Sequence, residues 1–123
     1  MTAKHLSLGT EGEARAAAFL RRRGYRIVAR NVRAGGVEID LIARRGALVI
    51  FVEVKTRRCL AQGPPELAVD ARKTARLLRG AAAWLQGRPG RACEVRFDVI
   101  ACECDRSGHW HVRHLEAAFD AGP

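Results

Sequence analysis

The sequence predicts an α/β protein in which a mixed central sheet is flanked by helices. Segments expected to be helical or extended follow one another in the order α-β-β-β-α-β. Residues 48–52 form an unbroken apolar run, which is typical of a central strand covered on both faces. The chain has 123 residues, of which 48% are hydrophobic, so it is long and apolar enough to bury a core of its own.

The first helix is expected to begin at Thr10, after a flexible lead-in over residues 1–9, so that residues 10–123 form a single domain. Thr10 and Glu13 have the spacing of a capping box, in which each side chain accepts a hydrogen bond from the backbone N–H of the other. Gly24 is expected to end this helix, because glycine readily adopts the conformation that closes a helix.

Extended segments are expected at residues 25–31, 37–41 and 48–56, separated by turns that contain glycine. The second of these alternates apolar and acidic residues, as a strand with one buried face does. Residues 94–101 predict a further strand. A hairpin turning at residues 105–108 predicts an extra strand at the C-terminal end.

A second, long helix is expected over residues 66–86. Its apolar residues recur at three- and four-residue steps and predict a buried stripe. A basic ridge on the opposite face is either a solvated surface or a set of phosphate contacts, which position a nucleic acid without reading its sequence. The stripe comprises Ala71, Ala75, Leu78, Ala82 and Leu85, and the ridge comprises Arg72, Lys73, Arg76 and Arg79.

The charge of the chain points to a polyanionic partner. Its 22 Lys and Arg residues exceed its 13 Asp and Glu residues, which leaves a net charge of +9. Nucleic acid is the commonest polyanion that such a surface attracts, although a merely solvated exterior has the same composition. No apolar stretch has the form of an export signal or a membrane span, so we expect a cytoplasmic protein without membrane contact and with reduced cysteines.

Asp40 and Glu53 are notable because both are acids at the ends of strongly apolar strands, where burial of an unpaired carboxylate is costly. Pairing of the two strands around residues 45–46 is expected to place position 40 opposite position 51, with Glu53 as its diagonal neighbour about 7–8 Å away. Lys55 faces the same way as Glu53. Such a set can bind a divalent ion such as Mg²⁺ and hydrolyse phosphodiesters, and the alternative is an exposed salt bridge at the strand ends.

These segments resemble the uncharacterised YraN-like family of the restriction-endonuclease-like superfamily, whose signature is PD-(D/E)xK. That family is in turn similar to archaeal Holliday-junction resolvases. The family usually has Gly-Glu-Ile-Asp, whereas this chain has Val37 before the glutamate, with Gly36 one position earlier. The resemblance covers roughly residues 8–101 and includes the motifs Glu38-Ile39-Asp40-Leu41 and Phe51-Val52-Glu53-Val54-Lys55.

The resemblance implies a restriction-endonuclease-like α-β-β-β-α-β core and an endonuclease or structure-selective nuclease, with DNA as the more expected substrate. It implies Mg²⁺ or Mn²⁺ as the cofactor and leaves a homodimer open. The alternative is a nucleic-acid-binding module of a repair or recombination complex that keeps the fold without cutting. The implied catalytic residues are Asp40, Glu53, Lys55 and Glu13, the metal ligands Asp40, Glu53 and Val54, and the nucleic-acid contacts Arg30, Arg57, Lys73 and Arg76.

Some of these residues also have a purely structural interpretation. The capping box by itself explains Glu13. Arg30 pairs with Glu38 as readily as with a phosphate, and Glu38 is expected to be a solvated or supporting acid rather than a ligand. Asp98 on the last core strand is expected to be a buried hydrogen-bond acceptor rather than a residue that orients a base.

A zinc site at the C-terminal hairpin is a minor alternative. A turn at residues 106–107 makes Cys104 face His109 and Cys102 face His111, and two cysteines with two histidines suit tetrahedral zinc. These spacings differ from those of common zinc motifs, so incidental thiols and imidazoles are the preferred interpretation.

Overall fold

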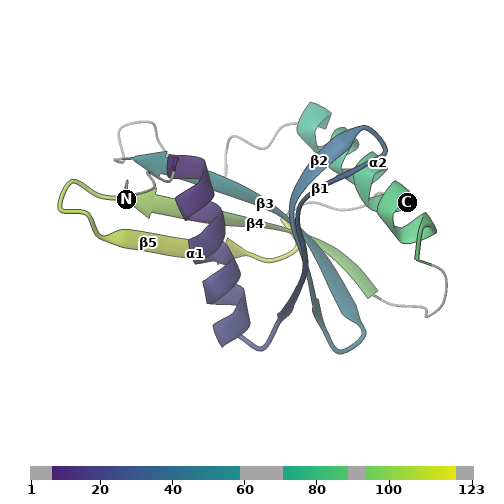
Figure 1. The fold of residues 1–123 in the computed structure, drawn as a ribbon, viewed down its shortest axis with the longest axis horizontal. Coiled ribbons are helices and arrows are strands. Elements are labelled where there is room, and N and C mark those ends of the chain that lie inside the picture. The colour runs from purple at the N-terminus through teal and green to yellow at the C-terminus, as the bar shows by residue number, and fades with distance from the viewer. Residues whose placement is uncertain (1–6, 59–70, 89–93, 119–123) are drawn as a thin grey trace, which may run out of the picture.

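The computed structural model describes residues 7–58, 71–88 and 94–118. Its elements follow the order α-β-β-β-α-β-β, which confirms the predicted fold class together with the extra strand at the C-terminal end (Figure 1). The elements are α1 (Leu8–Arg22), β1 (Arg26–Ala34), β2 (Val37–Arg45), β3 (Leu48–Arg58), α2 (Ala71–Gln86), β4 (Glu94–Cys104) and β5 (Trp110–Leu115).

The five strands form one mixed sheet in the order β1-β2-β3-β4-β5. The neighbours β1–β2, β2–β3 and β4–β5 are antiparallel, and β3–β4 is the parallel pair. A parallel pair requires a long crossover, and the segment containing α2 provides it. In Figure 1, α1 lies across β3 to β5, whereas α2 lies beside β1 and β2.

The start of α1 differs from the prediction. The N-cap is Ser7, whose hydroxyl accepts a hydrogen bond from the backbone N–H of Thr10 at 3.1 Å. The capping box at Thr10 was therefore wrong, because a good cap three residues upstream already satisfies that donor. Of the expected lead-in, residues 1–6 lie outside the described residues, and Leu8 already belongs to the helix. Gly24, at φ +89°, follows the end of the helix as expected.

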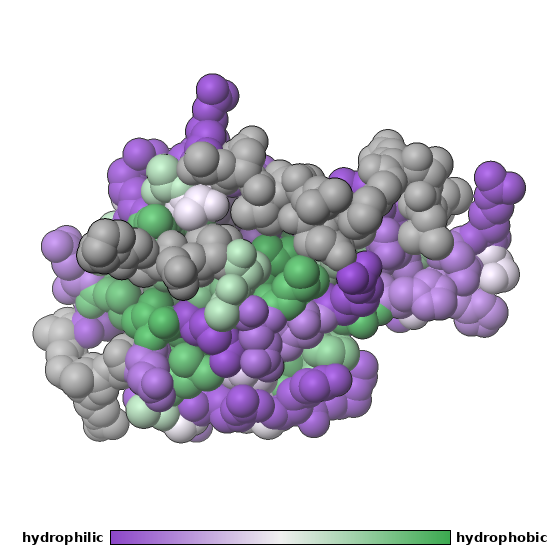
Figure 2. Space-filling model, turned by 180° about the vertical axis from the view of Figure 1, so that it is seen from behind, coloured by the Kyte–Doolittle hydropathy of each residue, from purple (hydrophilic) through white to green (hydrophobic). Residues whose placement is uncertain are grey.

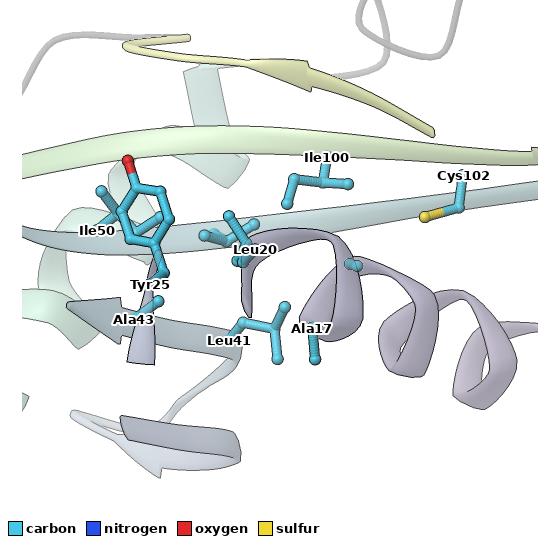
Figure 3. Packing of buried hydrophobic residues seen from close by; sticks show 10 residues of the cluster. Ala17, Leu20, Tyr25, Leu41, Ala43, Ile50, Ile100 and Cys102 are labelled. Atoms are coloured by element: carbon cyan, nitrogen blue, oxygen red, sulfur yellow. The ribbon is translucent and has the colours of Figure 1, made fainter. Parts of the chain in front are cut away.

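The first core lies between α1 and the sheet. Ala17 and Leu20 of α1 pack against Leu41, Ile50 and Ile100 from three different strands (Figure 3). Alternation along β3 turns Phe51 and Val49 to the other face, so β3 is buried on both sides as its unbroken apolar run predicted.

The second core lies under α2, and its stripe is rotated from the predicted one. Leu77 and Ala81 are buried against the sheet, whereas Ala75 and Ala82 are exposed. Gly80 accounts for the rotation, because it lets the helix backbone approach the sheet closely: a Cβ there would lie 3.2 Å from the Val37 Cβ. Leu78 and Leu85 lie at the margin of this core, and the part of the expected helix over residues 66–70 lies outside the described residues.

The β2–β3 register is two positions away from the predicted one. Arg45 pairs with Leu48 across a two-residue turn in which Gly46 has φ +61°. The residue numbers of each β2–β3 pair sum to 93, so the same register carried one step beyond Leu41↔Val52 puts Asp40 opposite Glu53 instead of diagonal to it. A shift of two preserves the face of every side chain, so the expected shared face of the two acids is retained.

The β4–β5 register removes the zinc alternative. Cys102 pairs with Val112, and Glu103 pairs with His111, which is one position away from the expected register. A shift of one turns the histidines to the opposite face from the cysteines. Among the described residues, no three Cys, His, Asp or Glu side chains are grouped so that they could hold a metal ion.

The two cysteines in the described part, Cys102 and Cys104, are free thiols, and Cys59 and Cys93 lie outside it. No helix in the described ranges combines the length and the apolar character that crossing a membrane needs. Seen from behind, apolar side chains gather in the middle of the molecule and hydrophilic ones around its edge (Figure 2).

Candidate active site

A pocket of about 190 Å³ lies between β2, β3 and the start of α2. It brings together residues that are far apart in the sequence, including four of the predicted site residues: Asp40, Glu53, Lys73 and Arg76. The remaining lining residues are Val37, Glu38 and Leu77.

The position of Asp40 follows from the divergence of β2 and β3. Their pairing ends at Leu41↔Val52, while β2 stays paired with β1 as far as Val37 and β3 stays paired with β4 as far as Arg58. At the point of divergence, the Asp40 Oδ2 accepts a hydrogen bond from the Val54 backbone N–H at 2.8 Å. The carboxylate thus replaces the lost backbone partner and is held in the gap between the two strands.

The surroundings of Asp40 disfavour its charged form. Burial is the main cause and raises the pKa of Asp40 to about 6, although the hydrogen bond from Val54 opposes the shift. Three further carboxylates, those of Glu53, Glu13 and Glu38, add repulsion that also raises the pKa of Asp40. A cation at this point would relieve both effects, because it compensates the lost hydration and neutralises the repulsion.

Glu53 carries two ammonium partners on one oxygen. Its Oε2 lies 3.5 Å from the Lys55 Nζ and 3.3 Å from the Lys73 Nζ. Burial, followed by the neighbouring Lys73 ammonium, lowers the pKa of Lys55, while Glu53 opposes that shift. Lys55 is 12% exposed and Lys73 is 47% exposed, so the strand lysine is fixed whereas the helix lysine has room to move.

The donor chemistry of this site fits a hard divalent cation. Asp40 and Glu53 supply two carboxylates, and Mg²⁺ is commonly held by one or two carboxylates together with water and substrate phosphates. Val54 can contribute only its backbone carbonyl, which faces the same gap as its N–H because both groups of a strand residue point to the same neighbour. No third acidic, His or Cys ligand joins them within the described residues, so water or substrate must complete the coordination.

The other predicted site residues, Lys55 among them, are not lining residues of this pocket. Glu13, half-buried on α1, is close enough to raise the pKa of Asp40. Arg57 is half-buried on β3, two residues after Lys55. Arg30 is exposed on β1 and is not among the lining residues.

Glu38 lines the pocket and acts on Asp40, so it is closer to the site than expected. Its position two residues before Asp40 was the available signal, since alternate residues of a strand share a face. Glu38 lies opposite Arg33 on β1, and within the described residues it forms no ion pair with Arg30.

Asp98 belongs to a separate network in the interior, which confirms that it is a buried hydrogen-bond acceptor. It is fully buried and accepts two 2.8 Å hydrogen bonds from Arg96 and one of 3.0 Å from the Ala117 N–H, and the His114 Nε2 lies at 2.7 Å. Arg96 also donates to the Tyr25 hydroxyl at 2.9 Å. None of the residues of this network lines the pocket, so we assign the network to the stability of the fold.

The fold and the pocket define an α/β protein with a five-stranded mixed sheet and a paired-carboxylate site. The model of the uncharacterised protein family UPF0102 matches residues 12–102, and the chain belongs to that family, which confirms the YraN-like resemblance. It is 44% identical over 115 residues to a UPF0102 protein of Trichlorobacter lovleyi, covering 93% of this chain and 91% of that one. It is 45% identical over 120 residues to a UPF0102 protein of Syntrophotalea carbinolica, covering 98% and 97%.

Proposed function

We propose that this protein hydrolyses phosphodiester bonds of nucleic acid with the help of Mg²⁺ or Mn²⁺, and that DNA is its substrate. One observation carries the proposal: Asp40, Glu53 and Lys73 line one pocket between diverging strands, and Lys55 pairs with the same Glu53 oxygen as Lys73. The chain that carries this pocket has a net charge of +9. Paired carboxylates that hold a cation, together with an ammonium beside them, suit the hydrolysis of a phosphodiester.

Each side chain has a definite part in this proposal. Asp40 and Glu53 would hold the cation, and a bound cation would polarise a phosphoryl oxygen and lower the pKa of a water attached to it. Lys55, fixed on β3, orients the attacking water or stabilises the charge that develops on the phosphate. Lys73 and Arg76 line the same pocket from α2 and contact the phosphate backbone.

The exposure of Lys73 supports its proposed part. Its ammonium pairs with Glu53 at 3.3 Å, and at 47% exposure its long side chain can turn from Glu53 to a phosphate in the pocket. Arg76 lies three residues after Lys73, on the same side of α2, and lines the pocket beside it.

A binding module without catalysis is the second candidate. It is favoured by the presence of just two acidic ligands among the described residues and by the ion pairs that already neutralise Glu53. It shares the basic surface and the pocket, so the two candidates differ in cleavage and in metal affinity rather than in nucleic-acid binding.

The test is cleavage of branched, single-stranded and duplex DNA, and of RNA, by purified protein in Mg²⁺ and in Mn²⁺. We expect Asp40→Asn and Glu53→Gln each to lower the cleavage rate by about 100-fold or more. Glu94→Gln, which removes an exposed acid at the start of β4, is the matched control and should cleave like the wild type.

Calorimetry with Mn²⁺ separates the two candidates. We expect one binding event that is lost in Asp40→Asn and retained in Glu94→Gln. Salt-sensitive DNA binding with no cleavage and no Mn²⁺ signal would reject the nuclease and leave the binding module.

A further inference from the structure

A second and larger pocket lies at the other end of β2. Its volume is about 460 Å³, and it is formed where the segment after α1 meets the β2–β3 turn. Three arginines and two glycines line it: Arg26, Arg44, Arg45, Gly24 and Gly46. No acid is among these lining residues, so the pocket is strongly positive.

Two of the arginines, Arg44 and Arg45, are held in place by uncharged groups. The Arg44 Nε donates to the Gly46 carbonyl at 2.9 Å, which leaves its two terminal nitrogens out of that bond. Arg45 donates from one terminal nitrogen to the Arg23 carbonyl at 3.1 Å, and its guanidinium lies 4.3 Å from the centre of the Tyr25 ring. These contacts orient the side chains without neutralising them, so their positive charge remains available to a ligand.

No carboxylate of the described residues forms an ion pair with any of the three arginines. Glu94 contacts the β2–β3 turn through its backbone, because its N–H donates to the Ala47 carbonyl at 3.0 Å. Glu94 is not a lining residue of the pocket. Arginine elsewhere in the same protein does find acids: Arg96 pairs with Asp98 at 2.8 Å. The absence of acidic partners is therefore specific to the arginines of this pocket and is not general to the arginines of the protein.

Two of these arginines lie on the same face of the sheet as Glu53. Arg26 and Arg44 are cross-strand partners, and Arg44 is also the partner of Val49, which packs in the core under α2. Along β3, Glu53 lies four residues after Val49 and therefore shares its face.

The distance between the two pockets suits a continuous polyanion. Arg44 is four residues from Asp40 along β2, which corresponds to about 13 Å at the rise of a strand. The phosphates of one DNA strand follow each other at about 3.4 Å along the duplex axis, so the separation spans about four of them. A planar guanidinium presents its donors as a fork that matches two phosphate oxygens.

We propose that this arginine pocket is a second phosphate-binding site, which holds the nucleic-acid backbone several nucleotides away from the carboxylate pocket. This inference rests on the proposed function in that nucleic acid is the ligand, but it does not require that the protein cleaves it. Free phosphate or an acidic peptide would not need the distance between the pockets, whereas a polynucleotide uses both.

The test is the salt dependence of binding to a fluorescein-labelled 20-base-pair duplex, measured by anisotropy in EDTA so that cleavage plays no part. Each phosphate contact contributes about 0.9 to the slope of log K against log salt concentration. We expect Arg26→Gln/Arg44→Gln to reduce the slope by about 1.8. Arg26→Lys/Arg44→Lys keeps the charge and should keep most of the slope, while circular dichroism verifies that each variant is folded.

Arg106→Gln is the matched control. Arg106 is exposed in the β4–β5 turn, next to the end of β4 that pairs with Arg58, and the arginine pocket lies at the opposite end of β3. This substitution removes one positive charge, and we expect it to leave the slope unchanged. A slope that falls no more per charge in the Arg26/Arg44 variant than in the control would overturn the proposal.

Kinetics distinguish the failure of this inference from the failure of the proposed nuclease. On a cleaved duplex, Arg26→Gln/Arg44→Gln should raise KM several-fold with kcat unchanged, because the pocket is remote from the reacting phosphate. If the wild-type protein cleaves nothing, the nuclease is rejected, and the salt slope in EDTA still decides whether the arginine pocket binds the backbone.

Discussion

At the scale of single residues, Asp40 shows how a strand pairing that ends early places a carboxylate in a partly buried gap. Its carboxylate stands in for a backbone partner of Val54, and this role keeps it in a partly buried gap among other acids. The cost of holding a charge there is part of what a bound cation would offset. The charged Asp40 carboxylate is therefore expected to lower the stability of the folded protein, while it provides a ligand for the cation in the proposed site.

The first prediction concerns the stability of Asp40→Asn. The pKa of Asp40 is about 6 in the folded protein against an ordinary 3.8, so the folded state binds this proton more tightly than the unfolded state does. Stability contributed by the protonated form is present below pH 3.8 and is lost as the pH rises through 6, with an upper limit of about 3 kcal/mol. Asparagine keeps an acceptor for the Val54 N–H and removes the charge, so it should stabilise the protein by about 1–3 kcal/mol at pH 7.5.

Urea unfolding of Asp40→Asn and wild type at pH 3.5 and pH 7.5 measures this effect. The gain should appear at pH 7.5 and vanish at pH 3.5, and Glu94→Gln serves as the control for removing an acid. A gain of the same size at both pH values would show that the charge of Asp40 is not its cause.

At the scale of elements, the docking of α1 on β3 depends on one close contact. Gly12 is buried, and a Cβ there would overlap the side chain of Thr56. The contact sets how near Glu13, the next residue of α1, comes to Asp40. Glycine is thus retained inside a helix, where it otherwise costs about 1 kcal/mol relative to alanine.

The second prediction concerns Gly12→Ala, in which the higher helix propensity of alanine is set against its overlap with Thr56. In an open helix Gly12→Ala would stabilise, but the overlap with Thr56 should make it destabilising by about 1–3 kcal/mol. Thr56→Ala removes the two nearest atoms, Oγ1 and Cγ2, but leaves the Cβ of residue 56 at 2.9 Å from the added methyl, so Gly12→Ala should become less costly in that background without becoming neutral. A thermal or urea double-mutant cycle measures the coupling, and additive effects of the two substitutions would contradict the contact.

At the scale of the whole molecule, the Asp98 network joins segments that are distant in the sequence. It connects Asp98 and Arg96 on β4 with His114 on β5, with the Ala117 N–H beyond it and with Tyr25 after α1. Burial alone raises the pKa of Asp98, but the hydrogen bonds from Arg96, His114 and the Ala117 N–H outweigh it, so the pKa lies below its ordinary value. The network therefore stabilises the fold, whereas Asp40 and Glu53 line the pocket.

The third prediction concerns this network under acid conditions. Because the pKa of Asp98 is lowered in the folded state, its contribution is present above the ordinary value of 3.8 and is lost as the pH falls through the lower native value. Asp98→Ala should destabilise the protein by about 3–5 kcal/mol at pH 7, since it leaves Arg96 and His114 without their acceptor. The difference from wild type should shrink as the pH falls below 3.8 in urea titrations.

Asp105→Asn is the control for this measurement. Asp105 lies in the β4–β5 turn, where its bond to His111 lowers its pKa in an exposed setting. Its replacement should cost much less than that of Asp98, because water readily satisfies the groups it leaves behind. Equal losses at the two positions would mean that burial of the Asp98 network adds nothing to stability.

The order of the elements and the shared face of Asp40, Glu53 and Lys55 were predictable from the sequence. Both depend on short-range signals: alternation along a strand, an apolar run for a strand covered on both faces, and glycines where the chain turns. The approach of Lys73 to the acids was predicted only in part, as a basic position on a helix, because nothing local indicates which strand a helix lies over.

The tertiary structure alone decided registers, the rotation of α2 and the surroundings of the acids. The β2–β3 turn lies at residues 46–47 instead of 45–46, the register of the C-terminal hairpin differs by one residue from the expected one, and α2 is rotated so that Gly80 faces Val37. Local periodicity is set by the backbone of each segment, whereas register and rotation are set by contacts between side chains far apart in the chain. The sequence by itself thus determined which residues can act together, and packing determined how closely Asp40, Glu53 and Lys73 meet.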